Sequence, residues 1–284
     1  MSQNQLPIAF QLSFSESVWR LIFEQVDLAP PRFVAELRSH ETQRLTYVTA
    51  ELPPGTLLSQ IQPAVPFHSA LVGLWNGLAL YHRFDNNRLP VPTALGAVDP
   101  KTGQIRWEWP QHTLKAANAE LVWAQRASLT DTTLSPVVVF RLSDGEPVET
   151  AIKPPAGHNS RLQFPVSYTT SSPWWPVIDR FLKKMGQIQP IESVDYLEVA
   201  DKLIFSYYYR EPNDRLRSSL LITDRRQTIW LHQPTGPGIE TTGLPSDASA
   251  RPLVGTGSFC VWQNQLITQL NSTCITSYFL TPTP

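Results

Sequence analysis

One stretch of this sequence, residues 95–109, constrains the fold more than any other. It reads Leu-Gly-Ala-Val-Asp-Pro-Lys-Thr-Gly-Gln-Ile-Arg-Trp-Glu-Trp, a short apolar run followed by the turn formers Pro100 and Gly103 and then by apolar residues that alternate with Arg106 and Glu108. Pro fixes one backbone angle, Gly accepts a positive φ, and alternation gives a strand one face to bury. The stretch therefore predicts a β-hairpin with one buried face.

The spacing of this turn recurs along the chain. Asp99 is followed by Gly103 four positions later and by apolar Ile105 six positions later. The other matches are Glu51 with Gly55 and Leu57, Arg141 with Gly145 and Pro147, and Asp224 with Thr228 and Trp230. The matches begin at residues 51, 99, 141 and 224, in steps of 48, 42 and 83 residues, and the last step is close to twice 42. A period near 42 residues is therefore implied.

A period of this size, with a few strands per unit, is the signature of a β-propeller, in which each blade is a small sheet that needs its neighbours to bury its faces. We therefore predict an all-β chain with one β-propeller domain over residues 1–284 and a helix-containing insertion at about residues 172–186. At this period the chain holds about six or seven blades. If the ring closes in the usual way, a strand from residues 8–23 lies beside residues 273–280. The alternative is a pair of β-sandwiches, in which Gly-containing turns recur by chance.

The composition agrees with a folded, strand-rich protein. The 284 residues include 26 Pro and only 2 Met, which argues against a helical protein and for many short strands joined by loops. A hydrophobic content of 42% makes disorder improbable. The formal net charge of −1 gives no electrostatic reason to expect nucleic acid or an anionic membrane as a partner.

The start of the chain and its two cysteines favour a cytoplasmic protein. Residues 1–17 contain no Lys or Arg and no continuous apolar block, so they do not resemble a secretory signal, and no stretch approaches the about 18 apolar residues of a membrane span. Cys260 and Cys274 allow at most one disulfide. In a reducing compartment each is expected to be a small buried hydrophobe.

One helix is predicted in the second half of the chain. Ser172 is a suitable N-cap, Pro173 suits the first helical position, and Gly186 is expected to end the helix. The residues expected on its buried face are Trp174, Ile178, Phe181, Leu182 and Met185. Consecutive helical residues point about 100° apart, so Trp174 and Trp175 cannot both face the core. The other ring either packs on a loop or is exposed. We single out Trp174 and Trp175 as candidate binding residues, an aromatic anchor for a partner, beside the simpler interpretation of a helix packed on a blade.

The residues of the opening stretch carry a family resemblance. Residues 95–108, with Ala-Val-Asp, a Thr-Gly turn and a closing Trp, resemble the repeat of quinoprotein-type (PQQ-like) β-propellers. The resemblance implies that Asp99 and Trp107 are structural residues that tie strands of adjacent blades together. Some members of that class bind pyrroloquinoline quinone with calcium and a vicinal cysteine pair, whereas others bind no cofactor and assemble protein complexes. Cys260 and Cys274 are not adjacent, so no cofactor is expected. The layout also resembles an uncharacterised bacterial family of propeller-like proteins of similar length.

Linear motifs for catalysis are missing from the sequence. It contains no Gly-x-Ser-x-Gly elbow, no phosphate-binding loop and no His-Glu-x-x-His, and His40-Glu41 lacks the second His that a zinc helix requires. The oxygen-rich segments Asp85-Asn-Asn87 and Pro212-Asn-Asp214 are expected as polar hairpin loops and not as metal sites. The six His, at positions 40, 68, 82, 112, 158 and 232, show no ligand spacing.

Three functions remain open at this point. The first is a binding or interaction platform for a protein or a small ligand, without catalysis. The second is a hydrolase or lyase whose site is assembled from blade loops at a central channel, because such a site needs no linear motif. The third is a carbohydrate-binding module that uses Trp-rich loops. Converging His and carboxylates would favour the enzyme, and an exposed aromatic patch would favour binding.

Overall fold

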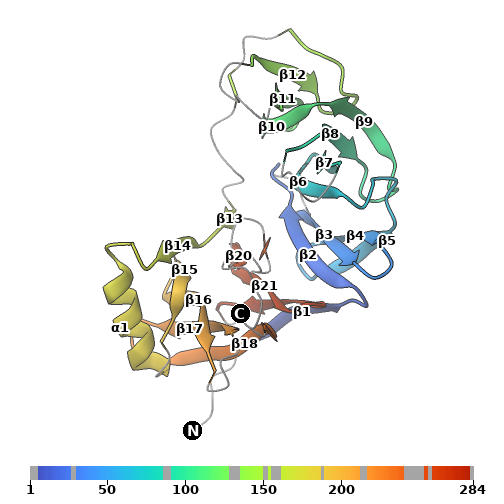
Figure 1. Cartoon of the computed structure of the whole chain (residues 1–284). Helices are drawn as coiled ribbons and strands as arrows, with labels where there is room; N and C mark the ends of the chain where they lie inside the picture. The colour runs from blue at the N-terminus through green and yellow to red at the C-terminus, as the bar shows by residue number, and fades with distance from the viewer. Residues whose placement is uncertain are drawn as a thin grey trace. The chain divides into compact units, whose positions relative to one another are not determined.

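The computed structural model describes residues 6–26, 30–85, 91–127, 135–149, 153–154, 161–186, 189–211, 216–239, 253–254 and 258–281. Within these residues the chain is all-β, with 22 strands and one helix (Figure 1). It divides into two compact units. The middle unit is Trp19–Ser160, and the terminal unit combines Met1–Val18 with Arg161–Pro284.

The middle unit consists of three antiparallel sheets that follow one another along the chain. The first contains β2 (Ser17–Phe23), β3 (Arg32–Ser39), β4 (Arg44–Glu51) and β5 (Thr56–Ile61). The second contains β6 (Ser69–Trp75), β7 (Leu78–Arg83), β8 (Ala94–Val98) and β9 (Ile105–Pro110). The third contains β10 (His112–Ala117), β11 (Leu121–Arg126) and β12 (Val137–Arg141). The predicted hairpin of residues 95–109 is confirmed as β8 and β9.

The recurring turn occupies an equivalent place in each sheet that carries it. The N–H of the Gly donates to the carbonyl oxygen four residues earlier, from Gly55 to Glu51 at 2.9 Å and from Gly145 to Arg141 at 2.9 Å. Each Gly has a positive φ, 86° and 75° respectively, which explains the preference for Gly at this position. In the fourth match, Asp224 with Thr228, the residue with a positive φ is one position earlier: it is Gln227, with a φ of 66°. Gly103 makes the same bond to Asp99 at 2.8 Å, so the spacing marks the same turn at three of its four matches.

Neighbouring sheets of the middle unit are joined through these turns. Trp107 of β9 donates its indole Nε1–H to the carbonyl oxygen of Leu142 at 2.7 Å, in the turn that follows β12. Asp99, by contrast, holds its own turn: its Oδ1 accepts the N–H of Lys101 at 2.9 Å, and its Oδ2 binds Arg106 at 3.0 Å. Trp107 thus links two sheets of the middle unit, whereas these bonds of Asp99 stay within one sheet and do not join two, as had been expected of it.

The terminal unit contains two five-stranded antiparallel sheets. One has the order β1 (Ile8–Ser13), β22 (Cys274–Phe279), β21 (Gln265–Asn271), β20 (Phe259–Trp262) and β13 (Leu162–Gln163). The other has the order β14 (Val166–Thr169), β15 (Ile191–Val199), β16 (Lys202–Arg210), β17 (Leu216–Asp224) and β18 (Ile229–Ile239). The remaining strand of the chain is β19 (Leu253–Val254). The predicted pairing of the two ends is confirmed, because β1 pairs with β22 and Leu12 faces Ile275.

The helix α1 (Trp175–Gly186) begins two residues later than expected and ends at the predicted Gly186. Ser172 does cap the turn before it, since its Oγ accepts the N–H of Trp174 at 3.3 Å. Because Trp174 precedes the helix, Trp175 takes the place on the buried face that the sequence assigned to Trp174. Trp175 packs with Ile178, Phe181, Leu182 and Met185 against the β14–β18 sheet.

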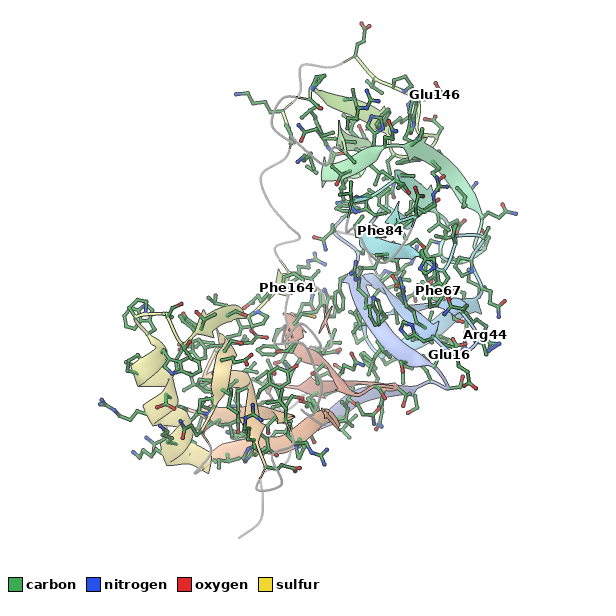
Figure 2. All side chains as sticks on the ribbon, in the orientation of Figure 1. Glu16, Arg44, Phe67, Phe84, Glu146 and Phe164 are labelled. Carbon is green, nitrogen blue, oxygen red and sulfur yellow. The ribbon has the colours of Figure 1, made fainter. Side chains whose placement is uncertain are left out.

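The expected all-β class with one helix is confirmed. The described residues form five antiparallel sheets, and none of the five closes on itself. Side chains fill the space between strands in both units (Figure 2). The number of blades and the single-domain ring stay predictions. Cys260 and Cys274 are free and buried, as expected. His158 and the segments 86–87 and 212–214 lie outside the described residues.

Candidate binding pocket

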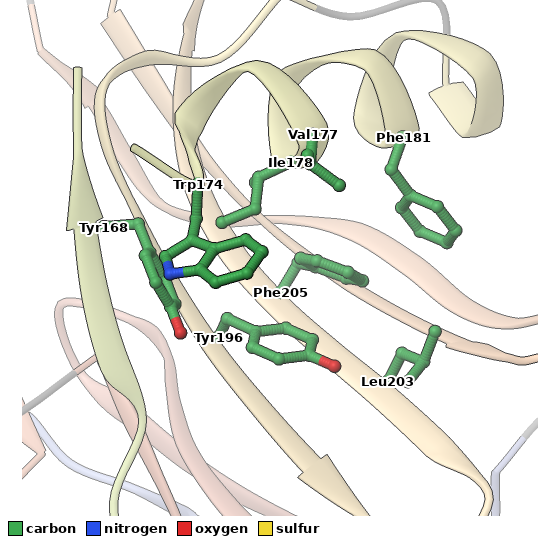
Figure 3. Close-up of a pocket in the computed structure, with 8 residues that line it drawn as sticks. All are labelled: Tyr168, Trp174, Val177, Ile178, Phe181, Tyr196, Leu203 and Phe205. Atoms are coloured by element: carbon green, nitrogen blue, oxygen red, sulfur yellow. The ribbon is translucent and has the colours of Figure 1, made fainter. Parts of the chain in front are cut away.

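An aromatic pocket of about 240 Å³ lies in the terminal unit, between α1 and the β14–β18 sheet (Figure 3). Its lining residues are all aromatic or aliphatic, and none carries a charge. They are Tyr168 from β14, Trp174 from the turn before α1, Val177, Ile178 and Phe181 from α1, Tyr196 from β15, and Leu203 and Phe205 from β16. Figure 3 shows that these side chains converge from four separate elements and from the turn before the helix.

The floor of the pocket follows from strand alternation. Tyr196 and Phe205 are directly paired across β15 and β16, and their ring centroids are 5.0 Å apart. Phe181 from the helix stacks on Phe205 at 5.2 Å, and Tyr168 lies 6.3 Å from Tyr196. Residues at alternate positions of a strand share a face, so the apolar face under the helix extends beyond it. The uncovered part of this face forms the pocket.

Trp174 stands at the edge of the pocket with its side chain 62% exposed. Its position is fixed by the backbone: its carbonyl oxygen accepts the N–H of Val177 at 3.1 Å and of Ile178 at 3.2 Å, which opens the first helical turn. Val177 is also exposed, at 61%. The expectation that only one of the two Trp can face the core is confirmed, because half-buried Trp175 packs there. Of the two places left open for the other ring, packing on a loop or exposure, Trp174 takes the exposed one.

The rim of the pocket carries a small polar network. The hydroxyl of Tyr196 donates to Glu198 Oε2 at 3.2 Å, and Glu198 forms an ion pair with Arg225. Burial, together with the nearby Glu198 carboxylate, raises the pKa of Tyr196 to about 12. Tyr196 is therefore protonated at neutral pH, and the pocket offers an uncharged aromatic wall.

Buried charged side chains of the middle unit bind backbone groups and each other. Glu36 Oε2 accepts the N–H of Leu71 at 2.9 Å, and its Oε1 accepts Arg38 Nε at 2.7 Å. The Arg38 guanidinium lies 5.1 Å from the Trp19 ring and 5.3 Å from the ring of Phe67, which is labelled in Figure 2. This arrangement fixes strands of two sheets to each other. The sequence analysis did not single out this pair.

The histidines with shifted pKa values are hydrogen-bonded within the fold. His82 Nε2 accepts the N–H of Leu114 at 3.0 Å, and burial, with the nearby Arg20 charge, lowers the pKa of His82 to about 4. His232 contacts the hydroxyl of Tyr207 at 2.9 Å, and burial lowers the pKa of His232. Both imidazoles are therefore mainly neutral at pH 7.

Among the described residues, no three side chains of His, Cys, Asp or Glu come together in a way that could hold a metal ion. No helix in the described part of the chain has the length and apolar character needed to cross a bilayer.

Sequence reasoning found Trp174 but missed its companions in the pocket. Tyr168, Tyr196 and Phe205 lie in three different strands, and in the sequence each reads as an ordinary apolar residue of a strand. The available signal was alternation: Tyr196, Leu203 and Phe205 fall on one face of the sheet that also receives the helix. What the alternation does not reveal is how much of that face a short helix leaves open.

The sequence matches no protein-family model and no curated protein. Among solved structures, a DUF4221 family member from Bacteroides vulgatus is similar at 10% identity, covering 98% of each chain with a TM-score of 0.36. Kuenenia stuttgartiensis hydrazine synthase is similar at 9% identity, covering 94% of this chain and 97% of that one, with a TM-score of 0.28. Both TM-scores lie below 0.5, so neither fold nor function is drawn from them.

Proposed function

We propose that this chain is a binding protein that captures an apolar group of a protein partner in the pocket beside α1. The observation that carries the proposal is the exposure of Trp174, 62%, at the edge of a pocket whose lining is uncharged. Large aromatic rings beside apolar pockets are the typical anchors of protein interfaces. Binding of a partner over Trp174 and Val177 would bury their exposed apolar surface, which favours association.

Trp174 is not needed to hold the helix on its sheet. Trp175 already contributes the indole that packs in the cluster around Leu182 and Phe205. Leu182 is 1% exposed and Phe205 is 4% exposed, and the cluster in which they pack includes Trp175 but not Trp174. Trp174 is thus a second, exposed indole beside a helix–sheet contact that Trp175 already makes. This supports a binding role for Trp174 more than a packing role.

The proposal keeps the wider interpretation drawn from the sequence. We take the chain to be a propeller-type platform that works in the cytoplasm without a cofactor, like those members of the quinoprotein-type class that assemble protein complexes. Antiparallel sheets joined through turns, as with Trp107 and Leu142, supply the rigid support that such a platform needs. Because the pocket lining carries no charge, we expect the contact residue of the partner to be apolar and uncharged.

The enzymatic alternative has less support in the described residues. The carboxylate of Glu36 is occupied by Leu71 and Arg38, and His82 accepts a backbone N–H. These groups already form hydrogen bonds that hold strands together, and a catalytic step would have to break those bonds. The exposed ring of Trp174 beside an uncharged pocket supports the binding interpretation, which an exposed aromatic patch was expected to favour.

Titration with an uncharged apolar dye tests the proposal. Nile red fluoresces on entering an apolar site, so wild-type protein should bind it with a saturable rise in emission. Trp174→Ala should weaken this binding by about tenfold or more, because it removes an anchor ring. The matched control is Trp19→Ala, which removes another exposed indole, in the β2–β5 sheet, and should leave dye binding unchanged.

Two results would overturn the proposal. One is dye binding by Trp174→Ala that equals wild type. The other is the absence of any saturable binding by the wild-type chain, provided that circular dichroism shows it folded.

A further inference from the structure

The free edge of a sheet lies directly beside the pocket. β14 is the end strand of its sheet, paired with β15, and no other described strand pairs with its second side. Tyr168, in the middle of β14, is at the same time part of the pocket wall. A ligand that reaches the pocket from this side therefore meets exposed backbone.

The backbone groups of β14 can be assigned a direction. The N–H of Thr170 donates to the carbonyl oxygen of Glu192 at 3.1 Å, so it points toward β15. Successive residues of a strand direct their N–H and C=O groups to opposite sides. Ser167 and Thr169 therefore direct theirs away from β15, toward the free edge. The Thr169 carbonyl oxygen already accepts the N–H of Ser172 at 2.8 Å. Among the described residues, the outward groups of β14 with no backbone partner are the N–H and C=O of Ser167 and the N–H of Thr169.

The side chains of β14 alternate in a way that suits a new strand. Ser167 donates its hydroxyl to the buried carboxylate of Asp195, on the face away from the pocket. Val166, which is 56% exposed, and Tyr168 lie on the pocket face. Side chains directly opposite each other on paired strands share a face, with their Cβ atoms about 5 Å apart. A strand added here would place every second side chain over the pocket.

This edge lacks the features that usually prevent strand pairing. Its four residues, Val166–Thr169, include no charge and no Pro, and its register with β15 is regular. The opposite edge of the same sheet, β18, contains Pro234, which cannot donate a backbone hydrogen bond. Natural sheets usually protect their edges with charges, prolines or bulges. β14 has only its short length as protection.

We propose that the partner presents an extended peptide segment that adds to β14 as an antiparallel strand. The proposal rests on the proposed function, because it names the kind of partner that fills the same pocket. In an antiparallel pair one residue of the peptide exchanges two hydrogen bonds with Ser167. Its two neighbours then lie opposite Val166 and Tyr168 on the pocket face. Since the lining carries no charge, the segment has the pattern apolar, any residue, apolar.

Selection from a library of random seven-residue peptides, against the whole chain, gives the first test. The enriched peptides should carry apolar residues two positions apart. The best peptide is then compared with a copy N-methylated at the residue between the two apolar positions. N-methylation removes an N–H that would donate to Ser167, so the affinity should fall by about tenfold or more.

A pair of variants tests the same edge from the protein side. Thr169→Pro removes an outward N–H and should weaken peptide binding by about tenfold. Thr169→Ala keeps that N–H and should bind as wild type does. Both variants lose the contact between the Thr169 hydroxyl and Ser171, so the comparison isolates the backbone group.

The outcomes separate this inference from the proposed function. Equal binding of the methylated and unmethylated peptides, or equal binding by the two Thr169 variants, would overturn strand addition while Trp174-dependent dye binding still stood. Failure to enrich any peptide, with dye binding intact, would overturn it as well. Loss of dye binding in the wild-type chain would instead overturn the pocket itself.

Discussion

The indole of Trp107 donates to the carbonyl oxygen of Leu142 at 2.7 Å, and both residues are buried. This one bond joins two sheets, because Trp107 belongs to β9 and Leu142 follows β12. The recurring turn therefore does more than connect two strands of one sheet. The turn after β12 also packs against the preceding sheet, β6–β9, through the bond to Trp107.

Loss of this bond should destabilise the protein measurably. Trp107→Phe leaves the buried Leu142 carbonyl without its donor, and we expect a loss of about 1–3 kcal/mol in the free energy of unfolding. Urea denaturation followed by circular dichroism measures it. Trp109→Phe is the control: Trp109 bonds Gly145 at 2.8 Å but is only half-buried, so water can replace the bond. An equal loss in both variants would contradict the argument.

Gly145 should tolerate a methyl group much less well than Gly77. Both have φ of 75°, so Ala at either position has the same backbone cost of about 1–2 kcal/mol. A Cβ at Gly145 would also lie 2.6 Å from Trp107 Cγ, whereas at Gly77 the nearest atom is Arg32 Nη1, at 3.5 Å. Thermal melts of Gly145→Ala and Gly77→Ala compare them directly, and equal midpoints would disprove the steric part of the argument.

The N-terminal strand should be required for cooperative folding of the terminal unit. Without residues 1–13, β22 loses the partner that covers it, and fully buried Ile275 becomes accessible at an open sheet edge. A chain that begins at Phe14 should therefore lose its cooperative transition or melt much earlier in calorimetry. Ile8→Ala, at a residue of β1 that is 56% exposed, is the control and should melt almost as wild type does. Normal melting of the deletion would refute the prediction.

Stability should fall as the pH drops below about 6.5, partly through His82. Its pKa in the folded protein is about 4, below the ordinary value of 6.5, so the unfolded chain binds the proton more tightly. The contribution is fully present above pH 6.5 and is lost as the pH falls toward 4, by about 3 kcal/mol at most. Urea denaturation between pH 4 and 7 should show a shallower pH dependence for His82→Gln, whose amide oxygen can still accept the Leu114 N–H. An unchanged slope would contradict this.

Trp174→Ala should leave stability almost unchanged while it weakens dye binding by about tenfold or more. The exposed ring makes few contacts to lose, so we expect a change within about 0.5 kcal/mol. Phe205→Ala, at the buried floor of the same pocket, should cost about 3–5 kcal/mol. Parallel urea titrations distinguish the two. A large loss in Trp174→Ala would mean that the indole supports the fold and that its binding data need reinterpretation.

Much of the local structure could be predicted because its causes are local. Pro100 and Gly103 determine a turn wherever they occur, and alternation determines a strand with one buried face. The all-β class, the equivalent turns and the helix ending at Gly186 follow from such patterns. Even the beginning of the helix was wrong by only two residues, because Ser172 caps the turn that precedes it and not the helix itself.

By itself, the sequence determined that strands would dominate, that two adjacent tryptophans could not both face the core, and that the chain's two ends could pair. Only the tertiary structure decided that the exposed ring is Trp174, that Tyr168 and Phe205 join it in one pocket, and that β14 is an edge. The physical reason is range: turns and alternation depend on neighbours in the chain, whereas a pocket depends on which distant strands and helix faces leave surface uncovered when they pack.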